Sequence, residues 1–340
     1  MKITELFGEK QIIAIIGLAK NTGKTVTLTK VMEELSATNR VVGVTSAGRD
    51  GEQYDVLNKL VRKPRIFVPS RNLVATTHIL MEKSEAKVEV VQETGIHTPL
   101  GKVFVGRVLQ GGNIEVAGPS SVSGIKAVAG MMCEAGASYV LVDGAFNRIA
   151  MASPAACDGF IVATGAILSP DLAVVVRETV RMIDLLRIPE IDNHHIKTLA
   201  LASGGMMLID DESLRVTPVV LDSPSRKGAR LAARLSSNTR YVVFDKSVVE
   251  SDLDELIKAR KGNPLTIILP DSTKLFISPY KLTWYQKRGL QIRVLAPANI
   301  LCVTVNPVAP GAHCFESSVM VAQIQKALPE IPVFDVLDQV

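Results

Sequence analysis

The amino-acid sequence predicts an α/β fold built around a largely parallel sheet. Short apolar runs rich in β-branched residues recur along the chain, and such runs are typical of buried strands. They lie at 11–17, 40–46, 102–108, 139–144 and 159–165. Helical patterns lie between several of them, at 25–37, 121–135 and 171–187. This alternation favours crossover units, which connect parallel strands through helices.

Two segments interrupt the alternation. Residues 86–118 contain strand-like runs separated by turn residues, which predicts an antiparallel, β-rich insertion. Around 187–197 the chain becomes polar and contains a proline, so we expect a domain boundary somewhere in 188–225. Further strand and helix patterns follow this region, which predicts a second, smaller α/β domain.

Composition limits the classes of function. The 340 residues are 47% hydrophobic and 21% charged, as in an ordinary globular protein. The net charge of +4 is small and dispersed, so we expect no nucleic-acid binding. No apolar run approaches the roughly 18 residues of a membrane span, and no signal peptide is recognisable. The four cysteines form no Cys-x-x-Cys pair, which favours a reducing, cytoplasmic compartment.

One stretch is a candidate phosphate site. In AIIGLAKNTGKT, residues 14–25, a strand pattern leads through a glycine-containing loop into a helical pattern. A phosphate loop needs this context, because backbone N–H groups and the positive helix end then converge on phosphate oxygens. We assign Lys24 to the outer phosphates and the Thr25 hydroxyl to Mg²⁺. The predicted binding residues are Gly17, Lys20, Asn21, Thr22, Gly23, Lys24, Thr25 and Val26.

The spacing of this motif is unusual. Five residues separate Gly17 from Gly23, whereas four is the commonest number in a phosphate loop. The alternative interpretation is an ordinary strand-to-helix turn in which the Lys-Thr pair occurs by chance. We favour the phosphate loop, because Gly-Lys-Thr lies where the binding mechanism requires it.

Two acidic segments are candidates for holding Mg²⁺. Asp143 follows the apolar run YVLV, as an acidic Walker B residue would, and we expect it to take part in catalysis together with Lys24. After the second predicted strand, the loop at 44–55 contains Asp50 and Glu52. Ligands bind at this edge of an open α/β sheet, so Asp50 is the preferred second Mg²⁺ partner and Glu52 the reserve. The alternatives are a simple turn at Asp143 and a solvated charged loop at 44–55.

Other polar groups are weaker candidates. Ser120 and Ser121 precede a predicted helix and suit anion capture, although helix capping explains them equally well. Cys302, His313 and Cys314 lack a fourth ligand and a regular spacing, so we predict no zinc site.

The phosphate-loop spacing resembles that of dethiobiotin synthetase and of the cobyrinic and cobyric acid synthases, whose loops read G-x5-G-K-[ST]. Gly17, Gly23, Lys24 and Thr25 occupy the matching positions. More widely, the chain is similar to the P-loop subunits of lysine 5,6-aminomutase reactivases. The segments that resemble this family are GLAKNTGKT, TSAGRDGE, TGIHTPLG, EVAGPSS, VDGAFNR, ATGA and VTVNPVAPG.

The resemblance implies a P-loop NTPase that uses ATP and Mg²⁺ as a subunit of a reactivating factor in lysine degradation. It implies two partners, an ATPase partner subunit and an adenosylcobalamin-dependent aminomutase, and it leaves a homo-oligomer open. On this basis residues 1–200 are the expected nucleotide-binding domain, and residues 201–340 bind a partner or substrate. The rival interpretations are an ATP-dependent carboxylate–amine ligase or amidotransferase and a nucleotide-binding regulator that never hydrolyses.

Overall fold

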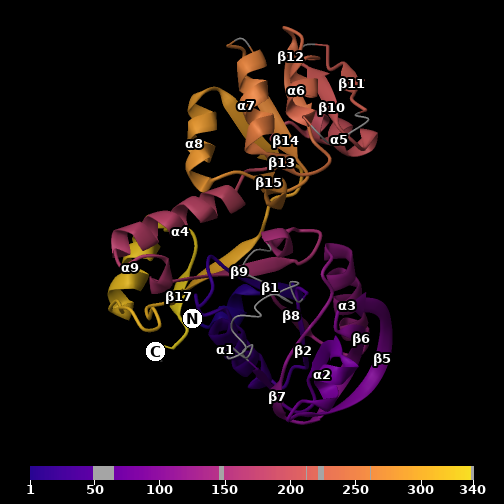
Figure 1. Cartoon of the computed structure of the whole chain (residues 1–340), viewed down its shortest axis with the longest axis vertical. Helices are drawn as coiled ribbons and strands as arrows, with labels where there is room; N and C mark the ends of the chain where they lie inside the picture. The colour runs from indigo at the N-terminus through magenta and orange to yellow at the C-terminus, as the bar shows by residue number, and fades with distance from the viewer. Residues whose placement is uncertain (49–64, 145–148, 212, 221–225, 261, 338–340) are drawn as a thin grey trace. The chain divides into compact units, whose positions relative to one another are not determined.

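The computed structural model describes residues 1–48, 65–144, 149–211, 213–220, 226–260 and 262–337 (Figure 1). The chain forms two compact units. Unit 1 consists of residues 1–180 and 299–340, and unit 2 consists of residues 181–298. This division differs from the expected domains 1–200 and 201–340, because the chain returns to unit 1 after completing unit 2.

Unit 1 is built on a nine-stranded, mostly parallel sheet with the order β18-β17-β9-β1-β8-β2-β4-β6-β5. The order places β1 next to β8 on one side and next to β9 on the other, and all three run parallel. The predicted mixed α/β fold with a largely parallel sheet is therefore confirmed. The parallel strands are β1 (Ile12–Gly17), β2 (Val42–Ser46), β4 (Leu73–Thr77), β8 (Tyr139–Asp143), β9 (Gly159–Gly165), β17 (Ile300–Asn306) and β18 (Val333–Asp335).

The two remaining strands of this sheet form the predicted insertion. β5 (Lys87–Thr98) pairs antiparallel with β6 (Gly101–Gln110), and β6 pairs antiparallel with β4. A short strand, β7 (Gly112–Ile114), follows and pairs antiparallel with β3 (Ile66–Val68). The β-rich character predicted for 86–118 is therefore confirmed.

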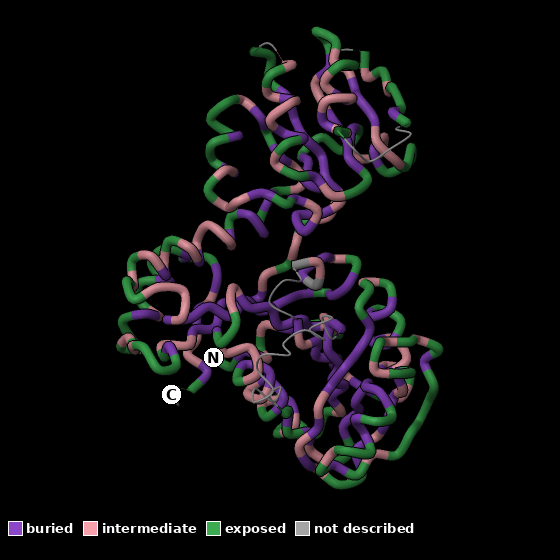
Figure 2. Tube along the Cα trace, in the orientation of Figure 1, coloured by how far each residue is buried: buried purple, intermediate pink, exposed green. Residues whose placement is uncertain are grey.

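Helices of unit 1 follow the strands as predicted. They are α1 (Lys24–Ser36), α2 (His78–Glu82), α3 (Val122–Glu134), α4 (Leu172–Leu186) and α9 (Ser317–Ala327), with the 3₁₀ turns η1 (Ile3–Leu6), η2 (Ile149–Ala152) and η3 (Ala166–Leu168). On α1 the stripe Leu28, Val31, Met32 and Leu35 is buried. Figure 2 shows the buried segments running through the interior of each unit. Each fully buried side chain of this size contributes about 1.5–3 kcal/mol relative to exposure, so the stripe holds α1 against the sheet.

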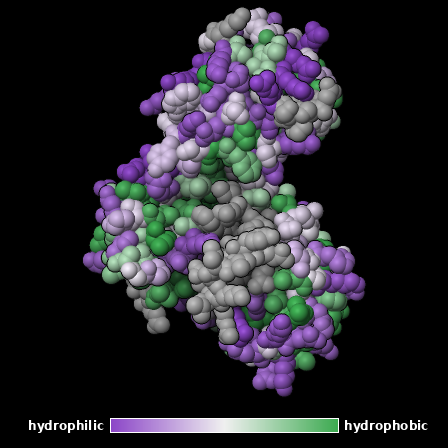
Figure 3. Space-filling model, in the orientation of Figure 1, coloured by the Kyte–Doolittle hydropathy of each residue, from purple (hydrophilic) through white to green (hydrophobic). Residues whose placement is uncertain are grey.

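Unit 2 has its own five-stranded sheet, in the order β11-β10-β12-β14-β16. Its strands are β10 (Met207–Asp210), β11 (Val216–Pro218), β12 (Thr239–Val243), β14 (Leu265–Leu269) and β16 (Leu290–Val294). Its helices and minor elements are α5 (His194–Ser203), α6 (Lys227–Ala232), α7 (Glu250–Ala259), α8 (Pro279–Lys287), β13 (Val248–Val249), β15 (Leu275–Phe276) and η4 (Ser272–Lys274). Figure 3 shows hydrophilic side chains over much of its visible surface, as expected of a unit that buries its apolar residues.

One ionic cluster in unit 2 is buried. Asp252 on α7 is only 4% exposed, and its carboxylate lies 3.4 Å from the Lys227 ammonium on α6. It also accepts the backbone N–H groups of Gly228 and Val249. A Cβ on Gly228 would lie 2.3 Å from the Asp252 backbone, so glycine is needed for the two helices to approach this closely. Asp252 therefore ties α6, β13 and α7 together.

Candidate functional site

The candidate site lies at the end of β1, where a compact loop leads into α1. Gly17 ends the strand, and a Cβ there would meet the Thr22 hydroxyl at 2.5 Å and the Lys24 side chain at 2.8 Å. Gly23 has φ +90°, in the left-handed region that glycine adopts without steric cost. Glycine therefore suits position 23 because of its backbone angle, and position 17 because a Cβ would displace the side chains of Thr22 and Lys24.

The N-cap residue of α1, Gly23, makes no side-chain capping hydrogen bond. The first N–H groups of a helix have no acceptor within the helix, and Gly23 at the N-cap has no side chain to cap them. Because the helix dipole adds positive potential at this end, such a terminus binds anions. The helix is anchored behind it by the stripe described above, so these donors are held in place.

Lys24 is the first residue of α1 and folds back over the loop. Its Nζ donates to the Ala19 carbonyl at 3.3 Å, and the Thr22 hydroxyl donates to the same carbonyl at 3.1 Å. Burial lowers the pKa of Lys24 from its ordinary value of 10.5, while the charge of Asp143 raises it in partial compensation. The ammonium is thus desolvated, which strengthens its attraction for an incoming anion.

Asp143 is placed beside this loop by the register of the sheet. It ends β8, where it pairs with Ile15 of β1 and with Ser46 of β2. The following N–H, of Gly144, donates to the Ile15 carbonyl at 2.9 Å, and a Cβ on Gly144 would lie 2.8 Å from that oxygen. The chain therefore leaves β8 close to β1, with the Asp143 carboxylate near enough to Lys24 to affect its pKa.

The other predicted site residues differ in their exposure. Thr22 is buried, Thr25 is half-buried, and three residues are exposed: Lys20, Asn21 and Val26. Asp50 and Glu52 lie outside the described residues, so the predicted second Mg²⁺ partner stays a prediction. The structure thus brings together Gly17, the loop to Thr25 and Asp143.

One residue that sequence reasoning missed lies against the loop. Asn306, at the end of β17, donates from Nδ2 to the Asn21 carbonyl at 2.9 Å. It lies within VTVNPVAPG, which drew attention only as part of a family resemblance. No local pattern could have found this contact, because 285 positions separate the two residues.

The weaker candidates have structural roles. Ser121 caps α3 by accepting the Gly124 N–H at 3.1 Å, as the capping interpretation predicts. Cys302 is fully buried, which raises the pKa of its thiol. The ring Nε2 of His313 lies 3.0 Å from the carbonyls of Ala166 and Ser169. Within the described part of the chain, no three His, Cys, Asp or Glu side chains are grouped to hold a metal ion.

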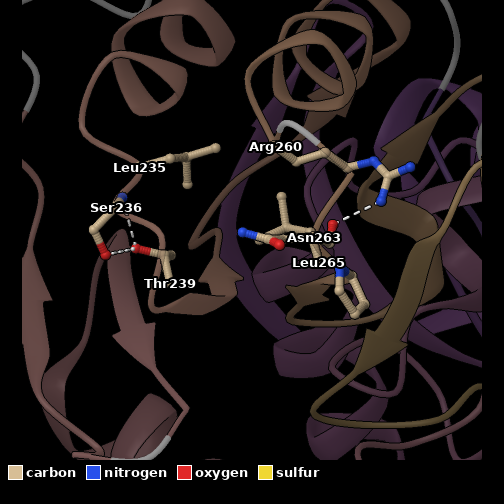
Figure 4. A pocket seen from close by; sticks show the side chains of 7 residues that line it. Leu235, Ser236, Thr239, Arg260, Asn263 and Leu265 are labelled. Carbon is tan, nitrogen blue, oxygen red and sulfur yellow. Dashed lines mark hydrogen bonds between the residues drawn. The ribbon is translucent and has the colours of Figure 1, made fainter.

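One hollow lies in unit 2 and a larger one in unit 1. The one in unit 2 has a volume of about 10 Å³, room for roughly one water molecule (Figure 4). It is lined by Leu235, Ser236, Thr239, Arg260, Asn263, Pro264 and Leu265. The larger, of about 320 Å³, runs along α1 in unit 1. It is lined by Thr25, Val26, Thr29, Lys30, Glu33, Val336 and Leu337, so two of the predicted site residues border it.

The site combines a helix N-terminus without a side-chain cap, a desolvated ammonium and a nearby carboxylate. Together these groups are suited to a polyphosphate with a divalent cation. Comparison with known proteins found no matching family model and no matching curated protein. Among the described residues, no helix is long and apolar enough to cross a membrane.

Proposed function

We propose that this chain is a P-loop NTPase that binds ATP with Mg²⁺ at the β1–α1 loop. The observation that carries the proposal is the placement of Lys24 and Asp143 around a loop that Gly17 and Gly23 make compact. The parallel sheet supports it, since the loop follows a central strand and Asp143 ends the adjacent one. The dethiobiotin synthetase type is favoured by the spacing of the two glycines.

The side chains at this loop fit a polyphosphate with Mg²⁺. A Cβ at Gly17 would lie within 3 Å of the Thr22 and Lys24 side chains, so glycine lets these two side chains pack against the end of β1. Lys24 would contact the outer phosphates, and the Thr25 hydroxyl and the Asp143 carboxylate would hold Mg²⁺. When bound, the cation supplies charge neutralisation for phosphoryl transfer. The chain's own contribution is to orient the phosphates and to offset their charge.

The biological role follows from the family resemblance. The chain would be the nucleotide-binding subunit of a cytoplasmic reactivating factor, which acts with an ATPase partner subunit on an adenosylcobalamin-dependent aminomutase. Loops that respond to ATP could change a protein interface, as in other nucleotide switches. Unit 2 suits the partner-binding role, because it is a separate compact body inserted between two strands of the nucleotide-binding unit.

Nucleotide binding can be tested by calorimetry with Mg·ATP, and hydrolysis by phosphate release, on the parent protein and three variants. Lys24→Ala should abolish binding with the fold retained, since Lys24 contacts the loop and not the core. Asp143→Asn should lower the hydrolysis rate about 100-fold and binding by less than tenfold. Lys126→Ala, at an exposed position of α3 that lines neither hollow, is the matched control. Equal binding by the parent and Lys24→Ala would contradict the proposal.

Reactivation needs a functional assay. Purified chain and its ATPase partner subunit should restore an inactivated adenosylcobalamin-dependent aminomutase in the presence of Mg·ATP, and Lys24→Ala should not. Amide formation from a carboxylate and an amine, with ADP release and no protein partner, would support the ligase interpretation. The burial of Cys302 and the contacts of His313 with backbone carbonyls offer no Cys–His pair for a glutamine-dependent enzyme.

A further inference from the structure

Asn306 joins the phosphate loop to the last part of the chain. Its Nδ2 donates to the Asn21 carbonyl at 2.9 Å, and its Oδ1 accepts the Val308 N–H at 3.1 Å. If the amide were turned round, Oδ1 would face the Asn21 carbonyl and Nδ2 would face the Val308 N–H, and neither pair could form a hydrogen bond. These two partners therefore determine the orientation of the amide. The side chain thus connects the loop after β1 to the loop after β17.

Two glycines make room for this side chain. A Cβ on Gly23 would lie 3.2 Å from the Asn306 Cβ. A Cβ on Gly165, at the end of β9, would lie 3.2 Å from the same atom and 2.9 Å from the Asn306 carbonyl. Asn306 therefore fills a slot between the phosphate loop and the end of β9, and larger residues around the slot would displace it.

The hydrogen bond acts on a residue with an unusual backbone conformation. Asn21 has φ +63°, in the left-handed region that non-glycine residues rarely adopt, although Asn tolerates it best. Such a conformation persists only where surrounding contacts favour it. The carbonyl that Asn306 holds belongs to Asn21, two residues before Gly23, so it sets the direction in which the chain enters α1.

We propose that Asn306 is a positioning residue that holds the phosphate loop in its ligand-binding conformation. The inference rests on the proposed function. A loop held in place before the ligand arrives loses less conformational entropy on binding, so the ligand binds more tightly. In this proposal Asn306 acts on the ligand through the loop, by its hydrogen bond to the Asn21 carbonyl. It therefore affects every polyphosphate that the loop binds, with or without a base.

The experiment measures the binding of Mg·ATP and of magnesium tripolyphosphate, which lacks the nucleoside, by calorimetry. Asn306→Leu keeps the size of the side chain and removes both hydrogen bonds. We expect it to weaken both ligands by about the same factor, roughly tenfold for the loss of such bonds. The thermal transition of each variant shows whether it is folded.

Asn299→Leu is the matched control. Asn299 precedes β17, and its Nδ2 donates to the Asp158 carbonyl at 2.8 Å, so it is an asparagine of the same kind at the other end of the strand. Its replacement should leave both affinities within twofold of the parent. An equal effect of the two variants would mean that β17 merely needs to be intact, and would overturn the inference.

A second variant covers the case in which Asn306→Leu fails to fold. Asn306→Asp keeps an acceptor for the Val308 N–H, but its other oxygen can donate to the Asn21 carbonyl only when the carboxyl is protonated. Tripolyphosphate affinity, expressed relative to the parent at each pH, should therefore recover as the pH falls from 7 to 4, the range in which an aspartate carboxyl of ordinary pKa, about 4, takes up its proton. A relative affinity that does not change with pH would overturn the proposed role.

Two further results are decisive. If Asn306→Leu weakens ATP but leaves tripolyphosphate unchanged, Asn306 contacts the nucleoside, and the inference is wrong although the proposed function stands. If the parent binds neither ligand, the proposed function fails and the inference fails with it. Binding of both ligands by the parent, with unchanged affinities in Asn306→Leu, overturns the inference alone.

Discussion

At the scale of single residues, two opposing effects act on the pKa of Lys24. Burial disfavours its charged form, and Asp143 only partly compensates. A charged ammonium that is partly buried destabilises the folded protein when no ligand is bound. It stabilises the complex when an anion is bound. The same property that suits Lys24 to phosphates is therefore a cost to the ligand-free fold.

This cost predicts a pH dependence of stability. Because the pKa of Lys24 is lowered on folding, the unfolded chain binds this proton more tightly than the folded chain does. The stability of the parent relative to Lys24→Met should then rise with pH between the lowered pKa and 10.5. Denaturant unfolding of both proteins from pH 7 to pH 10 measures the difference in their free energies of unfolding. Titrating groups that the two proteins share contribute equally to both and cancel in this difference. A constant difference over that range would contradict the prediction.

At the scale of elements, the phosphate loop depends on the absence of side chains at two positions. Gly23 is required for its backbone angle, and Gly17 is required for space. The neighbouring elements supply the rest: α1 supplies the helix end, β8 supplies Asp143, and β17 supplies Asn306. The loop motif is therefore one part of an arrangement to which three further elements contribute.

Gly17→Ala should remove polyphosphate binding. The new Cβ would come within 3 Å of the side chains of both Thr22 and Lys24, so these side chains would have to leave the positions that the proposal assigns to them. Gly130→Ala is the control, because Gly130 lies within α3 and a Cβ there meets nothing within 4 Å. That variant should keep its affinity and gain about 0.5–1 kcal/mol of stability from helix propensity. Calorimetry and thermal unfolding measure both effects.

The contact between α6 and α7 in unit 2 should depend strongly on Asp252. Asp252→Ala leaves the Lys227 ammonium without its buried partner and two N–H groups without their acceptor, at a cost of about 3 kcal/mol. Lys258→Ala on the same helix breaks an exposed pair with Glu255 and should have little effect. Denaturant unfolding compares them. Similar losses in the two variants would contradict the argument.

At the scale of the whole molecule, the two units are connected by the path of the chain. Unit 2 begins within α4 and ends immediately before β17, so both of its connections lead to unit 1. β17 pairs with β9 and β18, and the Thr27 and Thr304 hydroxyls join α1 to it at 2.9 Å. The last part of the chain is therefore part of unit 1, which contains the candidate site.

This topology predicts the result of two deletions. Ending the chain near residue 200 removes β17, β18 and α9 from unit 1, so we expect loss of polyphosphate binding. Replacing residues 181–298 by a flexible Gly/Ser linker should leave binding within about tenfold, because unit 1 keeps its core. The same replacement should abolish association with the partner subunit. Calorimetry measures polyphosphate binding, and co-purification measures association with the partner subunit. Polyphosphate binding by the chain that ends near residue 200 would contradict the prediction that the site needs the C-terminal strands.

The sequence by itself determined the local structure of this protein. Apolar runs located the strands, helical spacing located α1, α3 and α4, and turn residues located the β5–β6 insertion, because each signal depends on neighbouring residues. The same holds for the phosphate-loop motif and for Asp143 at a strand end. These features repeat with the period of the backbone, so they can be read without knowing the fold.

Only the tertiary structure decided which distant segments meet. It returned residues 299–340 to unit 1, set Asp143 beside β1 and brought Asn306 to Asn21. The order of strands in a sheet is chosen by how all the apolar faces pack at once, and no local pattern encodes that choice. Asn306 could not be predicted for this reason: its neighbours in sequence are an ordinary strand end, and its role comes from two glycines on other strands and loops.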